Sequence, residues 1–219
     1  MYNSVKDFFS YLNSREINYI VLRNYEEFEH DDFLISGHAD IDVLCSDRKS
    51  FREIIGVGEG QVHCRITIAN QNVPLDIRET GDGYYCTEWE EDMLMKRKMY
   101  NALCYVMDDE TYFYSLIYHV LIHKHSIAPE YPERLKNMGI RLGINDTSES
   151  KLIGILEDYM SAHGYYYVYP NDLGVALNFE NVNINRKMLR KSYSIIAMRK
   201  FMSLKSFAKR IIKTVIRKS

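Results

Sequence analysis

The stretch HADIDVLCSD, residues 38–47, carries two carboxylates, Asp40 and Asp42, inside a run that otherwise has the apolar composition of a buried strand. Side chains two residues apart on a strand point to the same face, so we expect both carboxylates on one face and Ile41 and Val43 on the other. Two neighbouring anions repel each other unless a cation lies between them. By spacing alone, the pair fits a solvated face and a divalent-metal site equally well.

A second apolar strand, VPLDIR (residues 73–78), carries Asp76, and Arg78 follows on the same face. If this strand neighbours the first, three carboxylates converge, with a guanidinium suited to phosphate beside them. This second strand favours the metal site over the solvated face. Oxygen ligands without an accompanying His or Cys favour Mg²⁺ or Mn²⁺ over zinc.

These motifs resemble the nucleotidyltransferase superfamily that includes DNA polymerase β. IVLRN (20–24), ADIDVL (39–44) and PLDIR (74–78) follow the order of its first strand, its Asp-hydrophobic-Asp strand and its third acidic strand. More narrowly, the chain looks like uncharacterised bacterial nucleotidyltransferase-like proteins that occur with surface-polysaccharide enzymes. The resemblance implies that Asp40 and Asp42 hold two metal ions. It also implies that Asp76 is the third ligand and helps to activate an attacking hydroxyl.

One position departs from that family pattern. Where the superfamily has Gly-Ser to hold a triphosphate, this chain has Arg23 and Asn24. Arg23 can grip a phosphate electrostatically, but the close backbone approach that Gly permits is lost. The donor is therefore open between a nucleoside triphosphate and a diphospho-activated alcohol, the kind used by related phosphocholine-transferring enzymes.

The order of elements predicts an α+β fold: a small mixed β-sheet nucleotidyltransferase core with helices on one side, then a helical C-terminal region. Helical spacing, with Ser4 as cap, predicts a first helix at 4–15. The strands are expected at 17–22, 39–45, 62–69 and 73–78, the last two joined by a turn at Asn70-Gln71-Asn72. Further helices are expected at 47–55, 109–125, 131–142 and 148–163. We divide the chain into a core (1–107), a helical region (108–202) and a tail helix (203–219).

The sequence YHVLIHKH (118–125) places His119 and His123 four residues apart on a helix. This spacing suits a shared metal, but the apolar neighbours make histidines in or near the core the favoured reading. Lys124 follows, and either binds donor phosphate across a cleft or lies on an ordinary helix surface. The candidate donor-binding residues are Arg23, Asn24, Arg78 and Lys124.

The tail differs in charge from the rest of the chain. All 30 Asp and Glu lie within the first 180 residues, whereas residues 186–218 hold twelve Lys or Arg. Apolar residues recur in the tail at helical spacing between basic ones, which predicts a basic amphipathic helix at 203–217. The helix either docks on the acidic remainder of the molecule or attaches to an anionic membrane. Nucleic acid is the less favoured partner, because the tail lacks interleaved aromatic residues and the remainder is acidic.

Together these features predict an Mg²⁺-dependent nucleotidyltransferase or phosphotransferase of bacterial surface-glycan biosynthesis. Its donor would be a nucleotide or nucleotide-activated compound, and its acceptor a glycan or small molecule. Two alternatives stay open: a non-catalytic or antitoxin-type binding module of the same fold, and a nucleotide-adding enzyme that acts on nucleic acid. With no signal sequence and no apolar run of about 18 residues, we expect a cytoplasmic protein. If the tail attaches to membrane and not to the protein itself, the protein is peripheral on the inner membrane face. Four separated cysteines are expected as reduced thiols.

Overall fold

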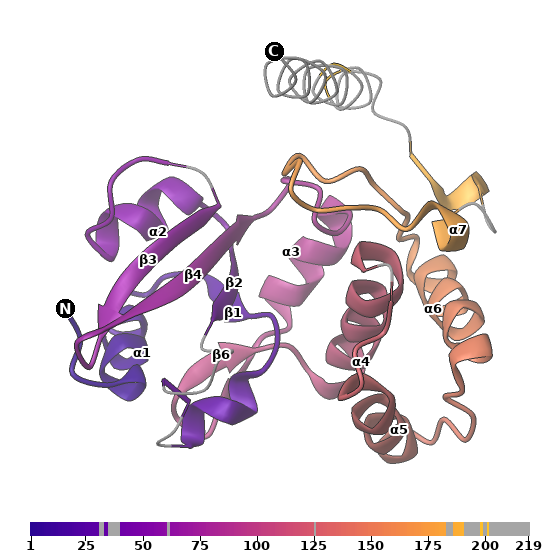
Figure 1. The fold of residues 1–219 in the computed structure, drawn as a ribbon, viewed down its shortest axis with the longest axis horizontal. Helices are drawn as coiled ribbons and strands as arrows, with labels where there is room; N and C mark the ends of the chain where they lie inside the picture. The colour runs from indigo at the N-terminus through magenta and orange to yellow at the C-terminus, as the bar shows by residue number, and fades with distance from the viewer. Residues whose placement is uncertain are drawn as a thin grey trace, which may run out of the picture.

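The computed structural model describes residues 1–30, 33–34, 40–60, 62–124, 126–182, 186–190, 198 and 201. In this part of the chain the fold is α+β, as predicted, with a mixed sheet in the order β3-β4-β2-β1-β6-β5 (Figure 1). The strands are β1 (Tyr19–Val21), β2 (Ile41–Cys45), β3 (His63–Ile68), β4 (Gln71–Glu79), β5 (Lys98–Tyr100) and β6 (Cys104–Val106). The α-helices are α1 (Val5–Asn13), α2 (Arg48–Ile54), α3 (Thr87–Met95), α4 (Asp109–Tyr118), α5 (Tyr131–Arg141), α6 (Glu149–His163) and α7 (Phe179–Val182).

The strand that carries the Asp-x-Asp motif lies in the middle of the sheet. β2 pairs antiparallel with β1 on one side and parallel with β4 on the other. All five residues of β2 are buried, including Asp42. Burying each large aliphatic side chain contributes about 1.5–3 kcal/mol. The apolar residues of the motif thus hold its charged residue at a fixed place in the core.

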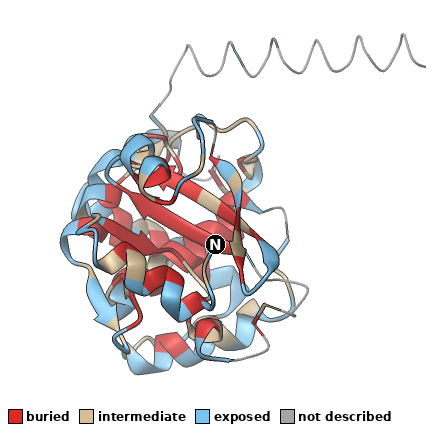
Figure 2. Ribbon diagram, turned by 90° about the vertical axis from the view of Figure 1, so that its left-hand side faces the viewer, coloured by how far each residue is buried: buried red, intermediate tan, exposed pale blue. Residues whose placement is uncertain are grey.

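Two helices cover one face of the sheet, where the sequence predicts them. α1 begins after Ser4, whose hydroxyl accepts the Asp7 N–H, and it buries its apolar stripe. Phe9 of α1 and Phe51 of α2 both contact the ring of Tyr19. The prediction of helices on one side of the core is wrong in this respect: the other face is covered as well, by α3 next to β1 and β2 and by the helical region beyond it (Figure 1). Figure 2 shows the sheet as a buried band between partly exposed helices.

The turn between β3 and β4 differs from the prediction. It consists of Ala69 and Asn70, both with positive φ, and β4 already begins at Gln71, which pairs with Ile68. A two-residue hairpin loop of this kind matches the right-handed twist of its strands, so it is favoured over the longer polar turn.

The helical region begins near its predicted start. α4 continues directly into a π-helical turn, His119–His123, and α5 and α6 closely match the predicted helices. A single cluster of buried side chains runs from Val5 to Val182, so the sheet and the helical region share one core. The predicted tail helix at 203–217 lies outside the described residues. The four cysteines are unpaired in the described structure, with Cys45, Cys86 and Cys104 buried and Cys64 half-buried.

Candidate active site

The three predicted carboxylates lie around the start of β2: Asp40 precedes it, Asp42 is its second residue, and Asp76 lies within the neighbouring strand β4. Asp42 of β2 and Asp76 of β4 are register partners on adjacent parallel strands, which lie about 4.8 Å apart. Asp40 is exposed and immediately precedes β2, two residues before Asp42. The pKa of Asp42 is raised chiefly by burial, and the negative charges of Asp40 and Asp76 add to this effect. We call Asp40, Asp42 and Asp76 the carboxylate site.

A guanidinium neutralises the buried member of this site. Nη2 of Arg23 lies 2.7 Å from Oδ2 of Asp42, and the Arg23 side chain is 15% exposed. The antiparallel pairing of β1 and β2 continues through the Leu22 N–H, which donates to the Asp42 carbonyl and brings the next residue alongside. Burial raises the pKa of Asp42, while Arg23 acts in the opposite direction. Arg23 therefore neutralises part of the negative charge on this face of the sheet.

Tyr84 connects Arg23 to the helical region. Nη1 of Arg23 donates to the Tyr84 hydroxyl at 3.1 Å, and that hydroxyl lies 3.0 Å from Nδ1 of His119. Burial lowers the pKa of His119 well below its usual value, and Arg23 adds to this effect. The ring is therefore neutral, and its Nδ1 can accept a hydrogen bond from the Tyr84 hydroxyl. His123 is also buried and packs against the Tyr84 ring. Both histidines occupy the core, with His119 next to Arg23.

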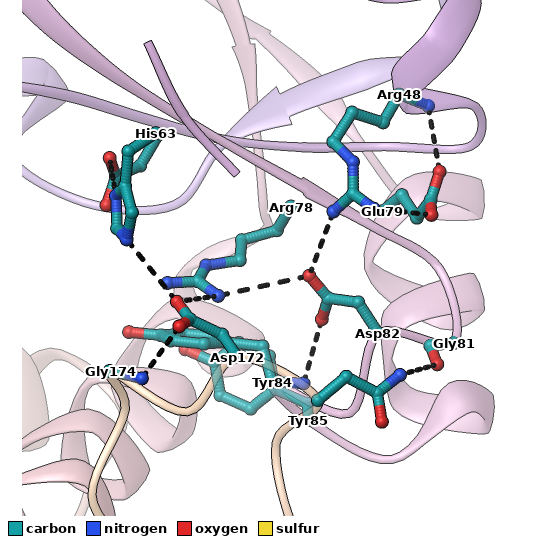
Figure 3. A network of polar contacts seen from close by, with 12 residues as sticks. Arg48, His63, Arg78, Glu79, Gly81, Asp82, Tyr84, Tyr85, Asp172 and Gly174 are labelled. Carbon is teal, nitrogen blue, oxygen red and sulfur yellow. Dashed lines mark hydrogen bonds and ion pairs between the residues drawn. The ribbon is translucent and has the colours of Figure 1, made fainter. Parts of the chain in front are cut away.

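Asp76 has a different partner. Its Oδ1 lies 2.6 Å from Nδ1 of His63, a half-exposed side chain on β3. Nε2 of the same ring lies 3.5 Å from Asp172, which belongs to the loop after Pro170. Asp172 also pairs with Arg78 at 3.0 Å (Figure 3). The chain thus brings a segment almost a hundred residues away onto the face of β4.

The predicted phosphate ligand Arg78 is enclosed. Its side chain is 6% exposed and lies over the ring of Tyr84, with the guanidinium carbon 4.5 Å from the ring centre. Besides Asp172, it faces Asp82 at 4.0 Å, and Asp82 in turn lies 3.9 Å from Arg48 (Figure 3). In this conformation Arg78 bridges the carboxylates of Asp82 and Asp172. Its positive charge also acts on Asp42 and lowers the pKa of that carboxyl group.

The other candidate donor-binding residues line a cavity of about 910 Å³. Arg23, Asn24, Asp40 and Lys124 contribute to its wall, together with Arg134 of α5. Asn24 has a left-handed backbone, with φ 59°, and its side-chain oxygen accepts from Nη1 of Arg134 at 2.8 Å. We call this space the Arg23–Lys124 cavity. Its wall is mixed in charge: three basic side chains and Asp40 are joined there by Glu27 and Glu130, so Arg23 and Lys124 are the candidate contacts for a phosphate-bearing compound.

The donor set fits a hard divalent cation in its chemistry, since carboxylate oxygens are the ligands that Mg²⁺ and Mn²⁺ prefer. In the described conformation, however, no three His, Cys, Asp or Glu side chains within the described ranges are grouped closely enough to hold a metal ion. An oxygen of Asp42 faces Arg23 and an oxygen of Asp76 faces His63. Asp40, Asp42 and Asp76 would hold a metal once these two contacts open.

Sequence reasoning missed three residues here: His63, Tyr84 and Asp172. The contact between His63 and Asp76 depends on the register of β3 and β4, which a two-residue turn sets. Tyr84 follows a Gly-Asp-Gly turn, and this was the only local signal for it. Asp172 reaches the site through tertiary packing alone.

In comparisons with family models, with curated proteins and with solved structures, this chain has no significant match.

Proposed function

We propose that this protein is an Mg²⁺- or Mn²⁺-dependent transferase that moves a nucleotidyl or substituted phosphoryl group from an activated donor to a hydroxyl acceptor. The observation that carries the proposal is the register of Asp42 with Asp76, beside Asp40 and next to a cavity that Arg23 and Lys124 line. Phosphoryl-type transfer needs positioning and charge neutralisation more than covalent help. The residues of this site supply both.

A divalent ion held by Asp40, Asp42 and Asp76 would activate the acceptor hydroxyl and stabilise the leaving oxygen. The chain's own residues have separate tasks. Arg23 and Lys124 bind phosphate oxygens in the cavity, while Arg134 fixes the Asn24 side chain beside them. His119 stays neutral in the core and accepts a hydrogen bond near Arg23, so it orients the guanidinium without adding charge.

The biological setting belongs to the same proposal. We place the enzyme in bacterial surface-glycan biosynthesis, at the inner face of the cytoplasmic membrane, on the strength of the family resemblance and the basic tail. Within the described part of the chain, no helix is long and apolar enough to cross a membrane. The donor would be a nucleotide or nucleotide-activated alcohol, and the acceptor a glycan or a small molecule.

The decisive experiment uses Asp42→Asn, which keeps the size of the side chain and removes its charge. We expect Mg²⁺-dependent transfer from a panel of radiolabelled nucleoside triphosphates and nucleotide-activated alcohols to be lost, by about a hundredfold or more. Calorimetry should show that Mn²⁺ binding is lost as well. Asp158→Asn, at an exposed position of α6, is the matched control and should retain both. An Asp42→Asn protein with full metal binding would contradict the proposal.

A second candidate, a non-catalytic binding module of the same fold, is favoured by one observation. The Arg23–Asp42 ion pair satisfies the buried carboxylate without any metal. A binding module should take up nucleotide in the Arg23–Lys124 cavity in the presence of a chelator, and Asp42→Asn should not weaken that binding. The transferase should instead need the metal for tight donor binding.

A further inference from the structure

Arg23 lies at the boundary between two places that a ligand would occupy. One nitrogen of its guanidinium contacts Asp42 at 2.7 Å, and the same side chain forms part of the wall of the Arg23–Lys124 cavity. Its other terminal nitrogen is held by Tyr84 and His119 at 3.1 and 3.3 Å. Arg23 is therefore ordered, largely enclosed and still open on one side.

A metal ion and this guanidinium compete for Asp42. Both are cations drawn to the same carboxylate, whose Oδ2 already faces Arg23, and they repel each other across a short distance where little water screens them. A metal on Asp42 therefore weakens the Arg23 contact and favours displacement of the guanidinium. The freed guanidinium would then lie partly buried without its counter-ion, which is unfavourable unless another anion replaces the carboxylate.

The Arg23–Lys124 cavity is where that anion can bind. Arg23 forms part of its wall, and Lys124 and Arg134 add positive charge there, beside the carboxylates of Glu27 and Glu130. A phosphate there would pair with Arg23 at the moment when the metal takes Asp42. Each ligand thus removes the electrostatic obstacle to the other.

From this exchange we infer that Arg23 couples metal binding to phosphate binding: the ion pair with Asp42 keeps metal affinity low until a phosphate group enters the cavity and draws the guanidinium away. The inference rests on the proposed function, because it takes Asp42 as a metal ligand. It goes further in making metal and donor bind together, with Arg23 as the positioning residue that links them. By linkage, the metal strengthens phosphate binding by the same factor.

The first test measures Mn²⁺ affinity by calorimetry and by electron paramagnetic resonance in the absence of any phosphate. We expect Arg23→Met to bind Mn²⁺ about tenfold or more tightly than the wild type, within the usual range of coupling between sites. Lys124→Met is the matched control, because it removes a positive charge from the same cavity without removing the Arg23–Asp42 ion pair; its affinity should rise much less. Equal affinity in the wild type and Arg23→Met overturns the inference.

The second test needs only wild-type protein, so it stands even where Arg23→Met folds poorly. Sulfate, a tetrahedral dianion that chelates Mn²⁺ weakly, serves as the phosphate probe, against sodium chloride of equal ionic strength. Sulfate should tighten Mn²⁺ binding several-fold in the wild type and have no such effect in Arg23→Met. An absence of any sulfate effect in the wild type also overturns the inference.

Failure of the proposed function gives a different result. If neither the wild type nor Arg23→Met binds Mn²⁺ under any condition, the carboxylate site is not a metal site and both proposals are wrong. If both bind equally well and Asp42→Asn does not, the metal site stands and only the coupling is wrong.

Discussion

Glu90 is a fully buried carboxylate that shapes the loop behind the candidate site. Its Oε2 accepts the Gly81 N–H at 2.7 Å and its Oε1 accepts the Tyr85 N–H at 2.9 Å. The loop between them carries Tyr84, which holds Arg23. Burial raises the pKa of Glu90 to about 8, and the nearby negative charge of Asp82 adds to this effect. One acidic residue in the core thus links loop geometry to pH.

The raised pKa predicts that the free energy of unfolding falls as pH rises. Between the unfolded value of 4.5 and the folded value of about 8, the folded state holds a proton that the unfolded state has lost. Stability from Glu90 is therefore fully present below pH 4.5 and decreases by at most about 1.4 kcal/mol per pH unit up to about pH 8. Denaturation in urea at several pH values measures this slope.

The buried histidines change the free energy of unfolding in the opposite direction, and they do so at lower pH. The pKa values of His119 and His123 are lowered below the unfolded value of 6.5, chiefly by burial, so their contribution to stability is lost as pH falls below 6.5. The window from pH 6.5 to 8 therefore reports Glu90. Glu90→Gln should flatten the slope there, and Glu91→Gln, at an exposed neighbouring position, should not. An unchanged slope in Glu90→Gln would assign the pH dependence to another group.

At the scale of elements, the β3–β4 hairpin sets the register that brings His63 to Asp76. Ala69 occupies its turn with φ 48°, a conformation that costs an L-residue roughly 1–2 kcal/mol. Ala69→Gly should therefore raise the free energy of unfolding by about 0.5–1 kcal/mol, after the greater entropy loss of glycine is subtracted. Thermal and urea denaturation measure the change. The control is Ala162→Gly, at an exposed position of α6, where glycine should lower the free energy of unfolding by up to about 1 kcal/mol.

The elements that the sequence predicts well are those with a strong apolar period. β2 and β4 were found because charged residues interrupt apolar strands at a spacing of two, and that same spacing identified Asp40, Asp42 and Asp76. β5 and β6 are three residues each, and β5 is exposed or only partly buried, so they had no such signal. Contacts of the site that depend on register or on distant loops, such as His63 with Asp172, are tertiary. No local pattern encodes them.

At the scale of the whole molecule, the described part joins the sheet and the helical region through one core, and the loop that carries Asp172 ties them together at the site. Tyr169, in this loop, lies against Gly83: a Cβ on Gly83 would lie 2.8 Å from the Tyr169 carbonyl oxygen, and φ there is +76°. Gly83→Ala should therefore displace the loop and lower the melting temperature by several degrees, since about 1 kcal/mol corresponds to a few degrees. Gly58→Ala, which meets no atom within 4 Å and has no positive φ, is the control. Equal melting temperatures for the two variants would contradict this prediction.

The C-terminal tail differs in charge from the rest of the molecule, because all Asp and Glu residues precede it in the sequence. Residues 203–217 are predicted to form a basic amphipathic helix that would bring the protein to anionic membrane, where a lipid-linked acceptor of the proposed transferase would reside. Each basic residue near such a surface contributes about 1 kcal/mol of attraction, so the six Lys and Arg within 203–218 suffice for salt-sensitive binding.

Deletion of residues 203–219 should abolish co-sedimentation with anionic vesicles and leave the melting temperature unchanged. The variant with Lys209, Arg210 and Lys213 changed to Glu should lose vesicle binding in the same way. Docking of the tail on the acidic part of the molecule predicts the reverse: a lower melting temperature on deletion. If the full-length protein stays in the supernatant with anionic vesicles even at low salt, the membrane interpretation is wrong.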